Sequence, residues 1–257
     1  MKVVRVPAGN KQGIDRKSRQ TLYRILRFEH LVRLFRDRQY TLLSPFSWED
    51  PFERLWSRLV LKDQPAHSDL ESRLFGSCLT FQARSDAMWS IYSRNWLGVR
   101  VTINLDELRR QAEAAPELAD GRMWFGEVSY LRDTQLEKCA LKLIHAVAEP
   151  DADQMEAIAM AWLNKRIAFK HEDEMRMLFV LPEKRSKSIP PKVFKFSVDP
   201  HALVKSIHID PRAPKELFET LQRDIEGSLE FRGSIQQSSL LRLPARLQAL
   251  LPNEPGM

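Results

Sequence analysis

The sequence predicts a single α+β domain in which a mixed or antiparallel sheet is flanked by helices. Short alternating apolar stretches, typical of strands, recur between stretches with helical spacing. The two kinds of element alternate irregularly, unlike the regular order of a parallel α/β protein. No repeat, low-complexity tract or long linker divides the chain. With 257 residues, of which 43% are hydrophobic, the chain can bury one sizeable core.

In the first half of the chain, the apolar period changes repeatedly between two and about 3.6 residues. Ser85 precedes an apolar run with helical spacing, and a serine in that place caps a helix amino terminus. Pro116 ends the helix that begins at Asp106. The expected elements are a strand at 21–26, a helix at 29–38, a strand at 40–43, a turn at 47–52 that leads into a helix, a strand at 74–81, a helix after Ser85, a strand at 96–103, a helix at 106–118 and a strand at 122–130.

The second half begins with the longest helical stretch, 133–168. Pro150 divides this stretch, which predicts a helical hairpin packed on the sheet. The elements expected after it are strands at 174–181, 192–197 and 204–209, a helix at 214–226, a short strand at 228–232 and a basic, apolar helix at 240–251. The domain boundaries follow: a flexible basic arm at 1–19, one α+β domain at 20–235, and a carboxy-terminal helix and tail at 236–257.

Composition limits the class of protein. Two cysteines, Cys78 and Cys139, are too few for a disulfide framework or a zinc site. No apolar run approaches the ~20 residues that cross a bilayer, and the start lacks the apolar core of a signal peptide. We therefore expect a cytoplasmic protein without a membrane segment. The net charge of +6 is concentrated early in the chain, which favours an anionic partner such as nucleic acid. The oligomeric state stays open.

Several common catalytic motifs are missing. With nine glycines, the chain has neither a Walker loop nor a Gly-x-Gly-x-x-Gly turn. No serine lies in a Gly-x-Ser-x-Gly elbow. The six histidines show no metal-ligand spacing. These absences leave P-loop nucleotide hydrolysis, Rossmann-type dinucleotide binding and serine hydrolysis without sequence support.

The most informative segment is 170–176, in which two acids lie two residues apart before an apolar run. In a strand, Glu172, Glu174 and Arg176 would project from one face. Two carboxylates on one face repel each other unless a cation, a proton or a substrate separates them. The structural alternative is a solvated strand entrance in which Lys170 and Arg176 pair with the acids.

Several segments, in order, resemble the bacterial domain of unknown function 2971. The likeness covers about 21–212 and rests on Leu22-Tyr23-Arg24, Leu43-Ser44-Pro45, Trp48 to Glu53, Ser77 to Thr80, Met88 to Tyr92, Gly98 to Val101 and Glu172 to Arg176. Two positions depart from the family pattern. Glu49 replaces the usual asparagine, and Ile91 replaces a usual histidine, so a catalytic role of that histidine would be lost here.

A looser resemblance concerns ADP-ribosyltransferases of the arginine-serine-glutamate type. These enzymes carry an arginine on an early strand, Ser or Thr on a central strand, and a Glu-x-Glu on a late strand. The resemblance implies an α+β fold of that type with NAD as substrate. It implies catalytic roles for Arg24, Glu172 and Glu174, and contacts with NAD for Tyr23, Arg24, Ser77, Thr80, Trp89, Tyr92 and Arg176. Asp50, beside Pro51, is a further candidate.

The implied chemistry is coherent. Cleavage of the nicotinamide glycosidic bond develops oxocarbenium character, which a fixed carboxylate such as Glu174 stabilises. The planar fork of Arg24 suits a diphosphate, and Glu172 could orient or deprotonate the acceptor. Each residue also has a structural alternative. Arg24 could be the ion partner of Glu174, the aromatic residues of 88–92 could be core, and Asp50 could be a turn residue.

Three functions are therefore open. The first is an NAD-consuming ADP-ribosyltransferase or NAD glycohydrolase, an intracellular toxin or antiviral defence effector that acts on a protein or nucleic-acid acceptor. The alternative is a non-catalytic nucleic-acid or partner-binding module of a bacterial defence system, because the basic early region accompanies Trp48, Trp56, Trp89 and Trp96. The third is a metal-dependent nuclease with ligands Asp50, Glu53, Glu172 and Glu174.

Overall fold

The computed structural model describes residues 2–6, 20–48, 50–61, 70–149, 153–182 and 192–248. Its strands are β1 (Lys2–Val6), β2 (Thr21–Arg27), β3 (Gln39–Leu43), β4 (Leu74–Thr80), β5 (Gly98–Asn104), β6 (Arg122–Glu127), β7 (Ser129–Leu131), β8 (Asn164–Arg166), β9 (Glu174–Val180), β10 (Val193–Ser197), β11 (Val204–Ile209) and β12 (Ser234–Gln237). Its α-helices are α1 (Phe28–Asp37), α2 (Pro51–Leu61), α3 (Asp86–Tyr92), α4 (Leu105–Ala114), α5 (Asp133–Ala148), α6 (Gln154–Ala161), α7 (Pro200–Leu203), α8 (Lys215–Gly227) and α9 (Ala245–Gln248).

Ten strands form one mixed sheet in the order β1-β6-β9-β4-β2-β5-β11-β12, and β3 joins it between β4 and β10. The pairs β1–β6 and β11–β12 are parallel, whereas the other pairs of this sheet are antiparallel. Strands β7 and β8 form a separate parallel pair. The predicted fold class, a single α+β domain with a mixed sheet flanked by helices, is confirmed.

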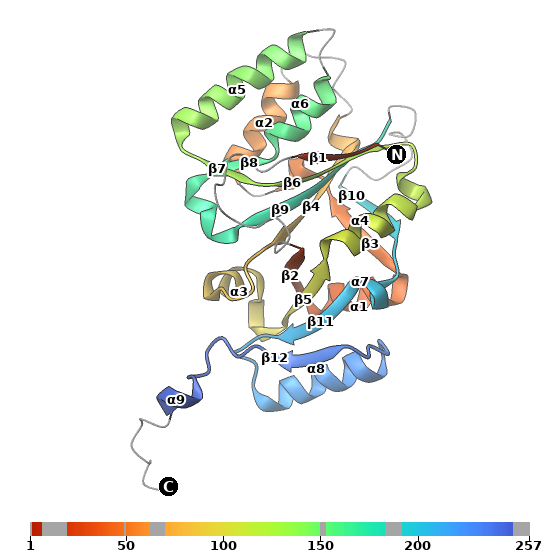
Figure 1. The fold of residues 1–257 in the computed structure, drawn as a ribbon, viewed down its shortest axis with the longest axis vertical. Helices are drawn as coiled ribbons and strands as arrows, with labels where there is room; N and C mark the ends of the chain where they lie inside the picture. The colour runs from red at the N-terminus through yellow and green to blue at the C-terminus, as the bar shows by residue number, and fades with distance from the viewer. Residues whose placement is uncertain are drawn as a thin grey trace, which may run out of the picture.

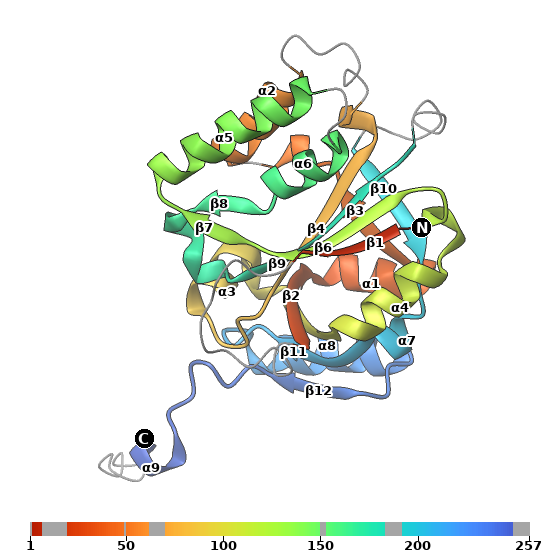
Figure 2. The same ribbon diagram turned by 45° about the horizontal axis from the view of Figure 1, so that its top comes forward.

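Helices cover the sheet in two groups (Figures 1 and 2). Helices α2, α5 and α6 lie together over the part of the sheet that contains β6 and β9, where they enclose a core around Trp124, Trp162 and Leu178. The larger core lies between the other sheet face and α1, α4 and α8, and includes Met177 and Phe179 of β9. All seven residues of β9 are buried, because alternate side chains lie on opposite faces of the sheet and both faces are covered.

Local signals place most of these elements where the sequence predicted them. The Ser85 side chain accepts a hydrogen bond from Met88 N and so caps α3. The Asn104 side chain caps α4 in the same way, with Glu107 N as donor. Helix α4 ends before Pro116, as expected from the missing amide proton of proline.

Some predicted elements differ from the structure. The helical stretch 133–168 ends with α6, and residues 164–172 form β8 and the 3₁₀ segment η7 (Ile167–Glu172). The last strand is β12 instead of 228–232, because residues 234–237 have β11 as a partner. Of the predicted flexible arm, residues 2–6 form β1, and 7–19 lie outside the described residues. Of the predicted helix 240–251, α9 is described and residues after 248 are not.

A buried polar lock joins α3 to the end of β11. The Ser93 hydroxyl donates a hydrogen bond to Asp210, which has no exposed surface, and accepts one from Gly98 N at 2.9 Å. Arg212 pairs with the same Asp210 carboxylate at 2.8 Å and donates to Trp89 O at 3.0 Å. Gly98 is required in this contact, since a Cβ there would lie 2.3 Å from Ser93 Cβ. The lock fixes the short loop between α3 and β5.

We predict that Gly98→Ala lowers the free energy of unfolding by about 1–3 kcal/mol, because the new methyl group forces Ser93 away from Asp210. The matched control is Gly227→Ala at the end of α8, where a Cβ has nothing within 4 Å. Its expected effect is a gain of up to about 1 kcal/mol from helix propensity. Chemical denaturation of both variants measures the difference, and equal stabilities of the two variants would contradict the prediction.

Candidate functional site

A cleft opens where the large sheet divides. Strands β2 and β4 share one register pair, Tyr23 opposite Thr80, and the described residues show no further pairing between these strands. Segments 23–27 and 76–80, which would pair if the sheet continued, instead form two walls of a cleft of about 810 Å³. The separation therefore produces the cleft, and β9, β8, α2 and α3 are among the elements that contribute further lining residues.

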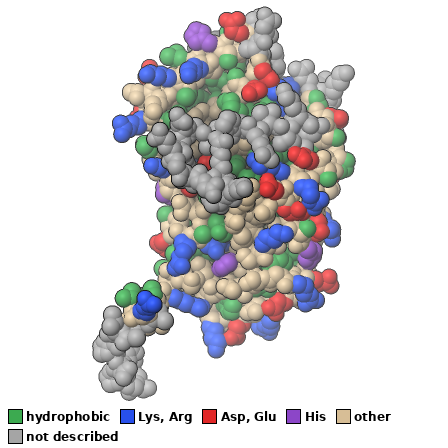
Figure 3. Space-filling view, in the orientation of Figure 1, with side chains coloured by type: hydrophobic (Ala, Val, Ile, Leu, Met, Phe, Trp, Pro, Cys, Tyr) green, Lys and Arg blue, Asp and Glu red, His purple; other side chains and the backbone are tan. Residues whose placement is uncertain are grey.

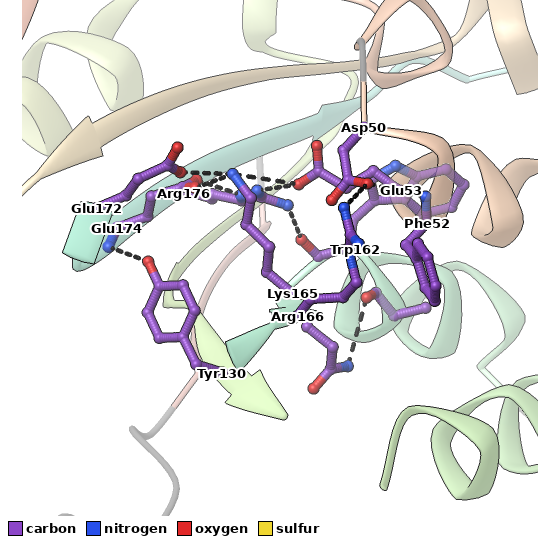
Figure 4. Close-up of polar contacts among 12 residues, drawn as sticks. Asp50, Phe52, Glu53, Tyr130, Trp162, Lys165, Arg166, Glu172, Glu174 and Arg176 are labelled. Carbon is purple, nitrogen blue, oxygen red and sulfur yellow. Dashed lines mark hydrogen bonds and ion pairs between the residues drawn. The ribbon is translucent and has the colours of Figure 1, made fainter. Parts of the chain in front are cut away.

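A cluster of buried charges forms one end of this cleft (Figure 4). The Lys165 ammonium, from β8, lies 2.5 Å from Glu172 Oε2 and 2.7 Å from Glu174 Oε1. It also lies 3.9 Å from Glu53 Oε1, which α2 provides. A lysine thus separates the two carboxylates that the sequence places two residues apart. The predicted strand entrance with Lys170 as a partner is not the arrangement found.

Arg176 is the second cation of the cluster. Its guanidinium is fully buried, donates from Nε to Glu174 Oε2 at 2.7 Å and from Nη1 to Trp162 O at 2.7 Å, and also pairs with Glu53. The ring of Trp48 covers it, with 4.6 Å between Cζ and the ring centroid. Since three of its nitrogens donate to protein acceptors, Arg176 holds Glu174 in place. It also lines the cleft, and its contact with NAD stays a prediction.

Three acids, Glu53, Glu172 and Glu174, face two cations, Lys165 and Arg176, so the cluster has an unbalanced negative charge only when all three acids are ionised. Burial raises the pKa of Glu172 above its usual range, and the neighbouring Glu174 carboxylate adds to the rise. Burial acts the same way on Glu174, but Arg176 and Lys165 prevail and hold the pKa of Glu174 well below its usual range. Glu174 is therefore a permanent anion, and Glu172 is the group that exchanges a proton.

A local change of backbone direction brings the two acids together. Glu172 ends the 3₁₀ segment η7 and Glu174 begins β9, so the two do not lie on one continuous strand as predicted. Asp173 between them has φ 40° and ψ 62°, which is left-handed geometry and uncommon for a residue other than glycine. Thr80 donates a hydrogen bond to the Glu172 carbonyl, and Glu174 N donates to the Tyr130 hydroxyl at 2.8 Å. These bonds keep both carboxylates on Lys165.

Cations line the cleft on the β2 side. Arg24 lies over the ring of Tyr40, 5.5 Å from its centroid, and the Tyr40 hydroxyl is hydrogen-bonded to Ser77 at 2.9 Å. No carboxylate lies within ion-pair distance of Arg24 among the described residues. Arg27 and Arg94 also line the cleft, and both are exposed. The cleft thus has a cationic side and an acidic end.

Register places Arg24 and Glu174 on opposite faces of the sheet. Arg24 is opposite Val101, which belongs to the larger core, whereas Thr80 is opposite both Tyr23 and Glu174. Both faces reach the cleft because it passes between β2 and β4. Glu174 takes its counter-ions from Lys165 and Arg176, so the alternative in which Arg24 neutralises Glu174 as an ion pair is wrong.

Most of the predicted site residues line this one cleft: Tyr23, Arg24, Asp50, Ser77, Thr80, Tyr92, Glu172, Glu174 and Arg176. Trp89 is the exception, since it is 1% exposed and belongs to the interior, as its structural alternative held. Asp50 is paired with Arg166 at 2.9 Å and caps the start of α2 through Phe52 N at 3.0 Å. The contacts of Asp50 are therefore those of a structural turn residue.

Lys165 is the functional residue that sequence reasoning missed. It lies within the stretch assigned to a helix, 133–168, and the three-residue strand that carries it pairs with β7 far away in the chain. The sequence suggests Glu53 only as a metal ligand. The two acids themselves indicate a cation between them, since their repulsion requires one.

The described residues do not support the metal-dependent nuclease. Within them, no group of three or more His, Cys, Asp or Glu side chains is arranged to hold a metal ion. Lys165 occupies the position between Glu172 and Glu174 that a cation would take. Asp50 points to Arg166 instead of to these acids.

The four tryptophans of the nucleic-acid hypothesis have different environments. Trp56 and Trp89 are each 1% exposed, and Trp48 covers Arg176, so these three serve the interior or the cleft. Trp96 is 45% exposed. Within the residues described, no helix has the length and apolar character that crossing a membrane requires.

The raised pKa of Glu172 predicts a pH-dependent stability. Between the ordinary carboxyl pKa and this raised value, the folded protein holds a proton that the unfolded chain has lost, so the free energy of unfolding falls as pH rises. Glu172→Gln mimics the protonated acid and removes this loss. Between about pH 5 and about pH 8, we expect the free energy of unfolding of the variant to rise relative to that of the parent by at most about 1.4 kcal/mol per pH unit.

Denaturation of parent and variant across this range provides the measurement. The exposed Glu216 of α8 supplies the control substitution, Glu216→Gln. Other groups, such as His208, whose pKa burial and Arg100 lower to about 4, act equally in all three proteins and cancel in the difference. A constant difference between Glu172→Gln and the parent would show that Glu172 does not hold this proton.

Comparisons with known proteins give limited matches. No curated protein matches the chain. Two solved structures of DarT from Thermus sp. 2.9 are similar in fold, one in complex with ADP-ribosylated ssDNA (TM-score 0.39, 12% identity, 86% of this chain and 95% of that chain) and one in complex with carba-NAD+ (TM-score 0.36, 13% identity, 86% and 96%). These values are too low to carry the function of DarT over to this chain. The predicted family resemblance is confirmed over residues 88–177, which match the family described as "Protein of unknown function (DUF2971)".

Proposed function

We propose that the cleft binds NAD, cleaves its nicotinamide–ribose bond and transfers ADP-ribose to a protein or nucleic-acid acceptor, or to water. One observation carries the proposal. The same cleft joins a wall of arginines to a buried cluster in which three acids share two cations. NAD has a diphosphate that needs cations, and its ribose becomes cationic as the bond breaks. The arginine wall therefore suits the diphosphate, and the acid cluster suits the ribose.

The acid cluster supplies the electrostatic part of the reaction. When the bond between ribose C1′ and the nicotinamide nitrogen breaks, its electron pair leaves with nicotinamide and the ribose acquires oxocarbenium character. Glu174 stays ionised beside this charge, because Lys165 and Arg176 hold its pKa low. The carboxylate is buried and fixed by two cations, so it stabilises the charge without reorganisation.

Glu172 serves as the proton acceptor in this proposal. An acceptor hydroxyl or a water molecule attacks C1′, and its proton passes to the Glu172 carboxylate. The raised pKa of Glu172 favours this transfer, since a base works best when its pKa lies near the working pH. The Tyr92 hydroxyl, 3.4 Å from Glu172 Oε1, lies on the cleft wall and orients the acid.

The diphosphate belongs at the arginine wall. Arg24 has an aromatic support and no carboxylate partner in the described part of the chain, so its fork can bind two phosphate oxygens. Tyr23 and Tyr92 line the cleft, where they can stack on the nicotinamide ring. Depletion of NAD or modification of an essential acceptor would make the protein an intracellular toxin or an antiviral defence effector.

We expect the purified protein to release nicotinamide from NAD, measured by chromatography. Glu172→Gln should lower kcat by about 10²–10⁴-fold and abolish the rise of rate with pH, because the proton acceptor is lost. Glu174→Gln should lower kcat by about 10²–10³-fold. Arg24→Ala should mainly raise KM by roughly tenfold or more, and Arg24→Lys should raise it less, since it keeps the charge but not the fork.

Exposed substitutions provide the controls. Glu216→Gln on α8 changes the same chemical group far from the acid cluster and should leave turnover unchanged. Unfolding curves separate loss of activity from loss of fold, which matters for the buried Glu174. If the parent neither releases nicotinamide nor modifies any lysate component, and the glutamine variants behave as the parent does, the proposal is wrong.

A further inference from the structure

A second groove lies beside the cleft, along α1. It has a volume of about 540 Å³, and Phe28, Arg33, Arg36 and Leu97 are among its lining residues. Arg27 lines both this groove and the cleft, so the two are neighbours. On the face drawn in Figure 3, cationic and anionic side chains are interspersed, so the net charge of +6 does not by itself define a binding surface there.

Two cations in the groove are available to an anion. Arg33 and Arg36 are exposed and lie about one helical turn apart on α1. The acids of the groove have other partners, since Glu29 pairs with Arg27 at 3.2 Å and Asp37 pairs with Lys195 at 3.7 Å. No carboxylate pairs with Arg33 or Arg36 within the described part of the chain.

An exposed tryptophan is the sequence neighbour of a residue that lines the groove. Trp96 precedes Leu97, a lining residue, and is 45% exposed. Asn95 and Trp96 have φ of 55° and 61°, a left-handed geometry that costs of order 1 kcal/mol for each such residue and persists only where the surroundings hold it. The polar lock of Ser93 holds one end of this loop, and the bond from Phe28 N to Leu97 O, 3.0 Å long, holds the other.

We infer that this groove binds a single-stranded nucleic acid, with Arg33 and Arg36 on its phosphates and a base stacked on Trp96. Cations that follow a backbone, combined with an exposed aromatic ring, are what proteins use to bind single strands. A loop that is held at both ends favours stacking because less backbone entropy is lost on binding. Resting on the proposed function, the inference identifies the acceptor class, since a strand in the groove would reach the cleft past Arg27.

The test measures binding without NAD. Fluorescence anisotropy of the full chain is recorded with labelled oligothymidylate and oligouridylate of about 12 nucleotides, and with a duplex of equal length. We expect both single strands to bind more tightly than the duplex, with affinity falling as salt rises. The double variant Arg33→Ala/Arg36→Ala should weaken binding and reduce the salt slope by about 1.4, that is about 0.7 for each lost phosphate contact. A preference between the two strands separates DNA from RNA.

Matched variants separate the groove from general charge. Lys138→Ala/Lys142→Ala removes two exposed cations from α5, which lies with the other helical group (Figure 1), and should change binding little. Trp96→Ala should weaken binding roughly tenfold or more, and Trp96→Phe should retain most of it because phenylalanine still stacks. Equal effects of the two double variants, equal effects of the two Trp96 variants, or tighter duplex binding would overturn the inference.

Two further outcomes keep this inference distinct from the NAD proposal. Nicotinamide release without oligonucleotide should be unchanged in Arg33→Ala/Arg36→Ala, because neither residue lines the cleft. Turnover of NAD with no oligonucleotide binding would overturn the inference alone. If, in addition, the Arg33 and Arg36 substitutions reduce modification of a lysate protein, the groove serves a polypeptide instead.

Discussion

The placement of Lys165 between two carboxylates is the interaction on which the arrangement of the cleft depends. Glu172, Glu174 and Glu53 come from three different elements, and each approaches the same ammonium group. Without this lysine, Arg176 would face three buried carboxylates alone, and removal of one partner from a buried ion cluster typically costs about 3–5 kcal/mol. The close approach to β6 of the turn between α6 and β8 is part of the same arrangement. Gly126, opposite Arg176, leaves room for Leu163, since a Cβ there would lie 2.3 Å from Leu163 Cδ1.

The division of the sheet gives this cluster a cleft to act on. Paired along their whole length, β2 and β4 would close the space between Arg24 and Glu174, which lie on opposite faces. Because pairing stops at Tyr23 and Thr80, one cavity reaches residues from both faces. A substrate in this space meets side chains that a continuous sheet would keep apart. The arrangement thus separates the arginine wall from the acid cluster while keeping them within one cavity.

Local signals were sufficient for most of the fold, whereas the short pairings and the charge cluster were not predictable from them. The cap at Ser85 and the stop before Pro116 depend on neighbouring residues, and both appear as predicted. Strand β8 has three residues and exists because β7 pairs with it. The apolar pattern around these residues predicts a continued helix, because local spacing does not reveal this pairing. The acids at 172 and 174 drew attention through their repulsion, but the sequence does not say which cation separates them. Most of the candidate residues chosen by their order along the chain line one cleft, although Trp89 is core.

The division of labour between the two acids follows from the same cluster. The looser resemblance favours Glu174 as the principal catalytic residue, yet both of its oxygens are held, one by Lys165 and one by Arg176. An acid held in this way stays ionised and cannot accept a proton at ordinary pH. Glu172 has one oxygen on Lys165 and the other beside Tyr92, and burial together with the neighbouring Glu174 carboxylate keeps its pKa high. Loss of the Glu174 charge would remove the main reason for that affinity apart from burial. The two acids are therefore coupled, and Glu174→Gln should lower the pKa of Glu172 as well as remove a stabilising charge.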